Sequence, residues 1–335
     1  MSHYRRTADG FAPVFAVAPM MDWTDRHCRY FHRQLTRHSL LYTEMIVADA
    51  LLNGDVEHLI GFDPIEHPVA LQLGGSDPDK LARAAEIGAR RGYDEINLNV
   101  GCPSDRVRSG AFGACLMREP DLVARCVAAM KRAVDVPVTV KCRLGVDEQN
   151  IESALDHLVD AVLAEGCNAL WVHARKAWLK GLSPKENREV PPLDYDRVRR
   201  LKARLPDTFV GLNGGLENLD AALRELRTAD GVMLGRSAYR TPDVLRNVDR
   251  HVYGDDAARA SDEELQAAMC AYVCDHVGKG GRANHVTRHM VGLFNGRPGA
   301  RRFRQILSEE ASRPGAGEEI VARAFAVFDD RRVAA

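Results

Sequence analysis

The stretch Val69-Ala70-Leu71-Gln72-Leu73-Gly74-Gly75 is followed by a helical pattern over Asp79–Arg91, and together they form one complete structural unit. The first run is apolar at nearly every position, which is typical of a strand buried on both faces of a parallel sheet. In the second, apolar residues recur every three or four positions, as on one face of a helix. The sequence therefore predicts a strand followed by a helix.

Eight such strand candidates lie between Phe11 and Tyr239. They are Val14–Ala18, Leu40–Thr43, Val69–Leu73, Glu95–Asn99, Val138–Cys142, Ala169–His173, Phe209–Leu212 and Gly231–Leu234. Helices are predicted at Asp79–Arg91, Asp121–Ala133, Ile151–Glu165, Tyr195–Leu205 and Leu219–Arg227. Eight strand–helix units can close into a (β/α)8 TIM barrel, which is the fold we expect. An open doubly wound α/β sheet is the alternative.

The pattern changes after Gly254. Residues 255–264 are mostly small or acidic and resemble a linker that enters a helix N-terminus, where carboxylates oppose the positive end of the helix dipole. From there to Ala335 the periodicity is helical, and no strand is predicted. We expect a barrel domain at residues 1–257 and an all-helical domain at residues 258–335.

Composition narrows the class of protein. The chain has 335 residues, 45% of them hydrophobic, which is enough for a large core. With 46 Lys+Arg against 47 Asp+Glu, binding to a polyanion would have to depend on local clusters of charge. The eight cysteines show neither a disulfide framework nor a complete zinc-ligand set, so we expect no metal. No signal peptide and no apolar run of about 18 residues is evident, so we expect a cytoplasmic protein without a membrane span.

Polar and glycine residues lie at the ends of the predicted strands or just beyond them, at the end of a barrel where active sites form. Gln72, Lys141 and His173 could donate hydrogen bonds to a polar heterocycle, and Lys141 could stabilise negative charge on its reduced form. Asn213-Gly214-Gly215 and Gly235-Arg236 follow the last two strands, where barrels often bind a phosphate. Each residue alone fits an ordinary rim or turn position. Together they predict a site for a phosphate-bearing flavin, FMN.

Cys102 lies just beyond the predicted strand Glu95–Asn99, between a glycine and a proline that would hold it over the barrel mouth. A thiol there could supply a proton while a flavin delivers hydride to an activated carbon–carbon double bond. Cys115, at the far end of the same loop, is the rival for this role. The interpretation as a buried, unreactive cysteine fits Cys126 and Cys167 better.

Basic residues are concentrated near the C-terminus. The segment from His276 to Ser308 contains seven Lys/Arg and no Asp or Glu. A solvated helix face is the usual explanation of a short charged run, but the length and single sign of this one favour contact with a polyanion such as RNA. A second basic region, Arg175–Arg188, follows the sixth strand and would flank the barrel mouth.

Several of these motifs resemble the tRNA-dihydrouridine synthase family over residues 13–310. They are Ala18-Pro19-Met20, Asn99-Val100-Gly101-Cys102-Pro103-Ser104, Gly113-Ala114-Cys115-Leu116-Met117, Lys141-Cys142-Arg143-Leu144-Gly145, Asn213-Gly214-Gly215 and Gly235-Arg236. The segment Thr287–Gly296 with Pro298–Arg301 is similar to the bacterial A subfamily in particular.

The resemblance implies reduction of uridine to 5,6-dihydrouridine at positions 20 and 20a of the tRNA D-loop, with FMN as hydride carrier and NADPH as reductant. We also expect a monomer. The resemblance also implies that Cys102 is the proton donor and that Asn99 contacts the target base. The implied FMN contacts are Pro19, Met20, Met21, Gln72, Lys141, His173, Asn213, Gly214, Gly215, Gly235 and Arg236. The implied tRNA contacts are Lys185, Arg188, Arg301 and Arg304.

Two other functions remain open at the level of sequence. One is an FMN-dependent barrel oxidoreductase that reduces an activated C=C bond of a small molecule, which leaves the basic C-terminal segment unexplained. The other is a non-enzymatic RNA-binding protein on a barrel scaffold, which would hold no flavin.

Overall fold

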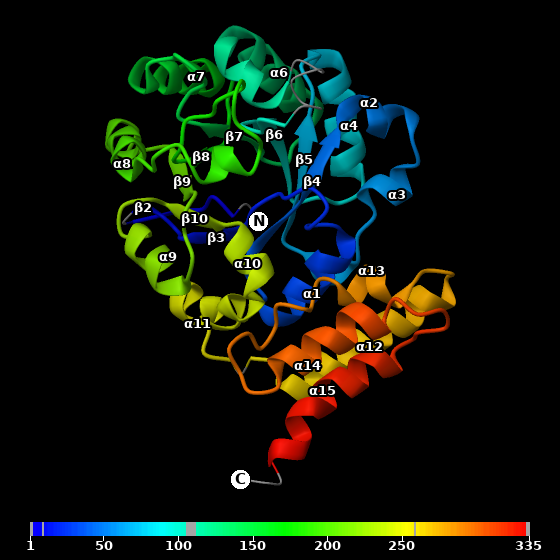
Figure 1. Ribbon diagram of the computed structural model, residues 1–335. Coiled ribbons are helices and arrows are strands. Elements are labelled where there is room, and N and C mark those ends of the chain that lie inside the picture. Colours follow the sequence, from blue (N-terminus) through cyan, green and yellow to red (C-terminus); the bar gives the residue numbers. More distant parts are fainter. Residues whose placement is uncertain (1–2, 9, 105–111, 258, 333–335) are drawn as a thin grey trace. The chain divides into compact units, whose positions relative to one another are not determined.

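The computed structural model describes residues 3–8, 10–104, 112–257 and 259–332 (Figure 1). Eight parallel strands form a closed barrel in the order β10-β3-β4-β5-β6-β7-β8-β9. The strands are β3 (Val14–Val17), β4 (Leu40–Val47), β5 (Val69–Gly74), β6 (Glu95–Val100), β7 (Val138–Arg143), β8 (Ala169–His173), β9 (Phe209–Asn213) and β10 (Gly231–Leu234). The predicted (β/α)8 barrel is confirmed, and the open sheet is excluded because β10 pairs with β3.

Each predicted strand is present, and one is longer than predicted. Strand β4 continues past Thr43 to Val47, and its register against β5 shifts between Tyr42 and Met45. Such an irregularity bends a strand and re-aims its side chains. The sequence pattern does not predict this extension because Glu44 interrupts the apolar run.

The five predicted barrel helices are also present, each beginning within one residue of its predicted start. The helical segments of the barrel are α2 (Ala48–Asn53), α3 (Val56–Ile60), η1 (Pro64–Glu66), α4 (Pro78–Arg90), η2 (Gly113–Arg118), α6 (Pro120–Ala133), α7 (Ile151–Ala164), η3 (Glu186–Arg188), α8 (Tyr195–Arg204) and α9 (Leu219–Glu225). Local chemistry explains where they start. The Asp77 side chain accepts from two backbone N–H groups of the first turn of α4, and Asn150 does the same for α7.

A short antiparallel hairpin, β1 (Arg6–Thr7) with β2 (Gly10–Phe11), precedes the barrel. Just before it, Tyr4 is buried in the barrel interior, with its ring 4.5 Å from that of Phe209. The sequence pattern does not predict this hairpin, because two-residue strands carry no periodic signal.

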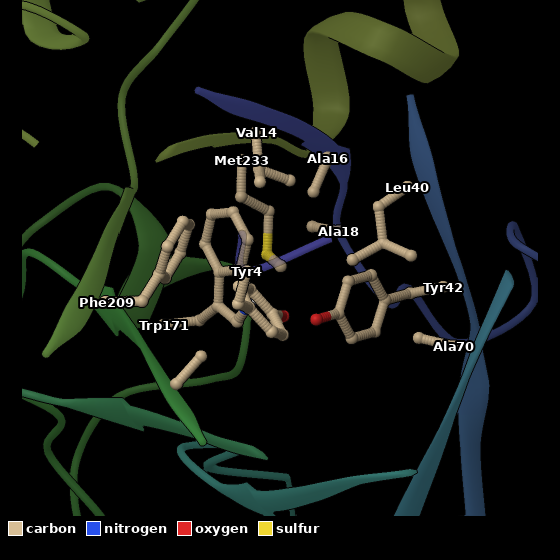
Figure 2. Packing of buried hydrophobic residues seen from close by; sticks show 11 residues of the cluster. Tyr4, Val14, Ala16, Ala18, Leu40, Tyr42, Ala70, Trp171, Phe209 and Met233 are labelled. Carbon is tan, nitrogen blue, oxygen red and sulfur yellow. The ribbon is translucent and has the colours of Figure 1, made fainter. Parts of the chain in front are cut away.

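The lower interior of the barrel is filled by large side chains, which we call the barrel floor: Tyr4, Tyr42, Glu95, Trp171 and Phe209. All of them except Glu95 belong to one apolar cluster with side chains from β3, β4, β5, β8, β9 and β10. Figure 2 shows the aromatic members packed together, with the hydroxyl groups of Tyr4 and Tyr42 directed toward each other. A filled floor leaves the opposite, C-terminal end of the strands for a site.

The remaining helices are α1 (Arg26–Leu35), α10 (Arg236–Arg240), η4 (Pro242–Asn247), α11 (Val248–Tyr253), α12 (Asp262–Gly278), α13 (Ala283–Thr287), α14 (Ala300–Gln305), η5 (Ile306–Glu310) and α15 (Glu319–Arg332). As predicted, no strand lies in the part of the C-terminal region that the structure describes, residues 259–332. Ser261 caps α12 with a reciprocal bond from Glu264, which explains the acidic residues at this predicted helix start.

The chain divides into two compact units, and the division differs from the predicted boundary at residue 257. The barrel unit is Met1–Met21 with Leu40–Gly235, and the helical unit is Asp22–Ser39 with Arg236–Ala335. Helix α1 belongs to the helical unit because its Tyr30 stacks on Tyr272 of α12, with ring centroids 3.8 Å apart. Sequence periodicity misses this assignment, because a helix between two strands is expected to cover the barrel.

Candidate active site

Strand β6 carries polar side chains at every second position, Glu95, Asn97 and Asn99, and all three are buried. Side chains alternate between the two faces of a strand. Ile96, between the first two, lies near α4, because a Cβ atom added to Gly88 would come within 2.8 Å of its side chain. The polar set therefore faces the barrel interior.

The carboxyl ends of the strands form the barrel mouth, which we define by Gln72, Asn99, Lys141, His173 and Gly214. Register places Asn99 beside Lys141 of β7, and His173 of β8 beside Asn213 of β9. The structure thus brings the predicted strand-end residues to adjacent positions around one end of the barrel.

Asn99 connects Gln72 to the cysteine loop. Its Nδ2 donates to Gln72 Oε1 at 2.7 Å, and its Oδ1 accepts from the backbone N–H groups of Gly101 at 3.1 Å and Cys102 at 2.9 Å. An Asn side chain that accepts from the backbone N–H groups two and three residues further along fixes the local turn. The conformation at Cys102 therefore depends on the orientation of one carboxamide.

The thiol of Cys102 is partly accessible and lies 3.5 Å from Ser104 Oγ. The carbonyl oxygen of Cys102 accepts from Ala114 N at 2.9 Å, so the two described ends of its loop are tied together. Cys115 follows in η2 and is also partly accessible. Residues 105–111 of this loop lie outside the described residues.

Three of the buried cysteines are poor acids. Burial raises the pKa of Cys126, Cys142 and Cys167 to about 12 each. Thiols of this kind stay protonated and unreactive at neutral pH.

Arg143, at the end of β7, is a buried cation that holds two loops. Its Nε donates to Gly101 O at 2.9 Å, and its Nη1 donates to Asn187 O at 2.9 Å and to Lys176 O at 3.3 Å. Burial lowers its pKa to about 10. Reasoning from the sequence did not assign it a role, although its place directly after the strand residue Cys142 is a usable signal.

Lys141 lies at the mouth with its side chain partly accessible. Burial and the positive charge of Arg143 lower its pKa to about 8. Within the part of the chain that the structure describes, its ammonium group has no hydrogen-bond or ion-pair partner. An unpaired, half-desolvated cation is suited to an anion or to a ring that gains negative charge.

His173 is the second unpaired polar group of the mouth. Burial and the neighbouring cations, Arg143 first, lower the pKa of its imidazole well below the usual value, so the ring is neutral. Its Nδ1 atom is buried and has no hydrogen-bond partner among the residues that the structure describes. Buried polar atoms are almost always paired, so this one points to a bound group.

The loop after β9 brings backbone close to this ring. Gly214 and Gly215 have φ angles of +109° and +67°, a region that favours glycine. A Cβ atom on Gly214 would lie 3.2 Å from His173 Cε1, and Tyr195 OH donates to the Gly214 carbonyl at 2.6 Å. This close approach is the kind of backbone cradle that accepts an anion.

The other predicted cofactor contacts occupy several places. Asn213 Nδ2 donates to Met233 O at 2.6 Å, which joins the ends of β9 and β10. Gly235 lies near Met20, because a Cβ atom there would be 3.6 Å from Met20 Sδ. Pro19 follows β3 as well, Met21 is 45% exposed, and Arg236 begins α10 in the helical unit.

The residues at the mouth fit a flavin. The unpaired Lys141 ammonium and His173 Nδ1 offer polar contacts to a heterocycle, and the Gly214-Gly215 backbone allows a phosphate to approach closely. No group of three or more His, Cys, Asp or Glu side chains arranged to hold a metal is found among the described residues.

The four basic residues predicted to contact nucleic acid are exposed. Lys185 and Arg188 lie at η3 in the loop after β8. On α14, Arg302 pairs with Glu310 at 3.0 Å, whereas its neighbours Arg301 and Arg304 form no ion pair with any residue the structure describes. Cations left unpaired in this way are available to phosphates.

The fold is a closed (β/α)8 barrel with polar groups gathered at the C-terminal ends of its strands. The family described as Dihydrouridine synthase (Dus) matches residues 16–328 of the chain. The chain therefore belongs to the dihydrouridine synthase family, whose enzymes are flavin-dependent oxidoreductases that form dihydrouridine from uridine.

Three relatives show how far the similarity extends, and each carries the name tRNA-dihydrouridine(20/20a) synthase. The protein of Shewanella oneidensis is 56% identical over 312 residues, 93% of either chain. That of Xanthomonas campestris pv. campestris is 57% identical over 323 residues, 96% of either chain. That of Salmonella typhimurium is 51% identical over 319 residues, 95% of this chain and 96% of its own.

No described helix has the length and apolar character needed to cross a membrane.

Proposed function

We propose that this enzyme reduces uridine to 5,6-dihydrouridine at positions 20 and 20a of tRNA, with FMN as hydride carrier and NADPH as reductant. The names of relatives that are 51% to 57% identical over nearly the whole chain support the substrate. One geometric observation carries the proposal: a single side chain, Asn99, bonds both Gln72 at the mouth and the backbone of Cys102. The groups expected to face the flavin and the proton donor are thereby held at one place.

One set of residues would bind the flavin. Lys141, His173 and Gln72 would contact the flavin ring, and the Gly214-Gly215 backbone would receive its phosphate. Bound FMN supplies the hydride. The further contacts we assign to it are Pro19, Met20, Met21, Asn213, Gly235 and Arg236.

The cysteine and the amide of Asn99 act on the base. Asn99 would orient the uracil, while Cys102 would hold at its Sγ the proton that completes the reduction. The thiol has to be protonated for this purpose, which distinguishes it from a nucleophilic cysteine.

Exposed basic side chains would bind the tRNA. A uracil stacked in RNA cannot lie against a flavin, so the target nucleotide has to be extruded. We assign Lys185, Arg188, Arg301 and Arg304 to the flanking phosphates and bases, acting in a monomer in the cytoplasm. The absence of ion pairs between Arg301 or Arg304 and any described residue supports their part in this assignment.

The test is to map dihydrouridine in tRNA after incubation with wild-type protein and with Cys102→Ala. Removal of the proton donor should lower the rate about 10²- to 10⁴-fold, the usual contribution of a positioned general acid. Flavin absorbance of the purified variant should stay at the wild-type level, because the thiol is not assigned a cofactor contact.

Cys115→Ala is the matched control, since Cys115 is also partly accessible and lies at the other end of the same loop. Unchanged turnover in Cys102→Ala, with loss in Cys115→Ala, would move the acid to Cys115. Free uridine serves as a second substrate. Its efficient reduction, without preference for tRNA, would favour the small-molecule reductase instead.

A further inference from the structure

A chain of buried hydrogen bonds runs inside the barrel from the mouth to the floor. Asn99 Nδ2 donates to Gln72 Oε1 at 2.7 Å, Gln72 Nε2 donates to Asn97 Oδ1 at 2.8 Å, and Asn97 Nδ2 donates to Thr139 Oγ1 at 2.8 Å. The Thr139 hydroxyl then donates to Glu95 Oε1. All five side chains are at most 7% exposed, so water does not replace these partners.

At the floor, the donor and the acceptor of each hydrogen bond in this series are defined. Glu95 accepts from Thr139 and Tyr42 at Oε1 and from Tyr4 at Oε2. Trp171 Nε1 can only donate, and it donates to the Tyr4 oxygen at 3.1 Å, while the Tyr4 hydroxyl donates to Glu95. Glu95 is thus surrounded by donors, and Thr139 has its lone pairs left for Asn97.

At the mouth, the backbone around Asn99 requires the same order of donors and acceptors. Two backbone N–H groups, those of Gly101 and Cys102, face the Asn99 side chain and need an oxygen there. A carboxamide is asymmetric, and its orientation follows from its hydrogen-bond partners. If the side-chain amides of Asn97 and Gln72 turned over, Asn99 would present its NH₂ group to the two backbone N–H groups, which are also donors, and these partly buried groups would lose their acceptor.

We propose that Glu95 is a positioning residue that acts through Thr139, Asn97 and Gln72 to fix the amide orientation of Asn99 and hence the backbone conformation at Gly101 and Cys102. The carboxylate lies at the floor and does not touch the site. Its effect on turnover rests on the function proposed above, whereas its effect on the loop does not.

The test is Thr139→Val, which keeps the shape of the side chain and removes the hydroxyl that links Asn97 to Glu95. In the flavin-free protein, hydrogen exchange of the Gly101 and Cys102 amides should be at least about fivefold faster, because a lost acceptor exposes these N–H groups to local opening. In the loaded enzyme, kcat for dihydrouridine formation should fall about 10- to 100-fold with KM for tRNA unchanged, since the misplacement affects a reacting group.

Tyr42→Phe is the matched control. It also removes one buried hydrogen bond to Glu95, but outside the chain that leads to Asn99. Its amide exchange at residues 101 and 102 and its kcat should stay within about twofold of wild type, because only a floor contact is lost. Thr139→Ser retains the hydroxyl and should recover most of both effects.

Equal exchange and equal kcat in Thr139→Val and Tyr42→Phe would overturn the proposal. If Thr139→Val does not fold, Glu95→Gln replaces it, because an amide at this position presents a donor to a ring of donors and gives the same comparison. Failure of wild-type protein to reduce tRNA would refute the proposed function alone. The exchange comparison would then still decide whether Glu95 positions the loop.

Discussion

The floor and the mouth of the barrel are built from the same strands, but buried polar groups are hydrogen-bonded at the floor and include unpaired ones at the mouth. At the floor, Glu95 accepts from three hydroxyl groups, and Trp171 Nε1 is paired as well. At the mouth, Lys141 has no partner in the described residues, and His173 Nδ1 is buried and unpaired. An unpaired buried polar group costs about 1–3 kcal/mol, so its retention marks the end of the barrel used for binding.

The largest effect is expected at the floor. Trp171 is fully buried, and its ring fills the space left by Gly211 and Gly231, where an added Cβ atom would lie 2.3 Å and 2.9 Å from it. Trp171→Ala should lower the free energy of unfolding by about 3–5 kcal/mol because the cavity cannot collapse between glycines. Urea denaturation measures this change. A loss below about 1 kcal/mol would show that the floor is not a stability centre.

A smaller effect is expected for Gly214→Ala. The substituted residue would keep a φ angle of +109° and press a methyl group against His173, which costs about 2 kcal/mol in a strained conformation. Affinity for FMN should fall at the same time, as followed by fluorescence titration.

Gly254→Ala controls for backbone strain alone, because Gly254 has a φ of +66° and a methyl group added there would meet nothing within 4 Å. If both variants lose equal stability and Gly214→Ala still binds FMN normally, the loop after β9 is not a cofactor cradle.

The smallest expected effect on stability is an increase, for Lys141→Met. The pKa of Lys141 is lowered to about 8 from 10.5, so the folded protein disfavours the cation. Lys141→Met should therefore stabilise the flavin-free protein at pH 7 by about 1–2 kcal/mol, a modest figure because the side chain is partly accessible.

The stability gained by Lys141→Met should depend on pH in a defined range. Between pH 8 and pH 10.5 the unfolded chain binds more protons than the folded one, so wild-type stability rises with pH and the advantage of Lys141→Met disappears by about pH 10.5. Thermal unfolding across this range measures it. Lys80→Met, at an exposed lysine paired with Asp49, should give no gain. A stability difference for Lys141→Met that is constant with pH would contradict the assigned cause.

Much of the fold could be predicted because strand signals are local. The run Val69–Leu73 is apolar enough to identify a buried strand by itself, and β5 begins at the predicted residue. Strand β4 was harder, since Glu44 interrupts its pattern and only pairing with β5 carries it on to Val47. The assignment of α1 to the helical unit depends on a stack between Tyr30 and Tyr272, residues that are far apart in sequence.

The residues of the candidate site could be predicted from the sequence, but their hydrogen-bond partners could not. Gln72, Lys141 and His173 each lie in the C-terminal half of a recognisable strand, so their shared location follows from the barrel. The position of Arg143 at the end of a predicted strand was a signal for the barrel mouth, but its partners were not predictable, because the two carbonyl groups it holds most closely, those of Gly101 and Asn187, lie in different loops. The alternation of Glu95, Asn97 and Asn99 was visible in the sequence, and it could have predicted a polar column inside the barrel.

The amino-acid sequence alone determined the eight strand–helix units, the polar residues at the strand ends and the basic C-terminal segment, since hydrophobic period, glycine and charge act over a few neighbouring residues. Only the tertiary structure decided which amide bonds which, that Glu95 is enclosed by Tyr4 and Tyr42, and that His173 keeps an unpaired nitrogen. The physical reason is that hydrogen bonds and desolvation depend on atoms brought within a few ångströms by closure of the barrel, whatever their separation along the chain.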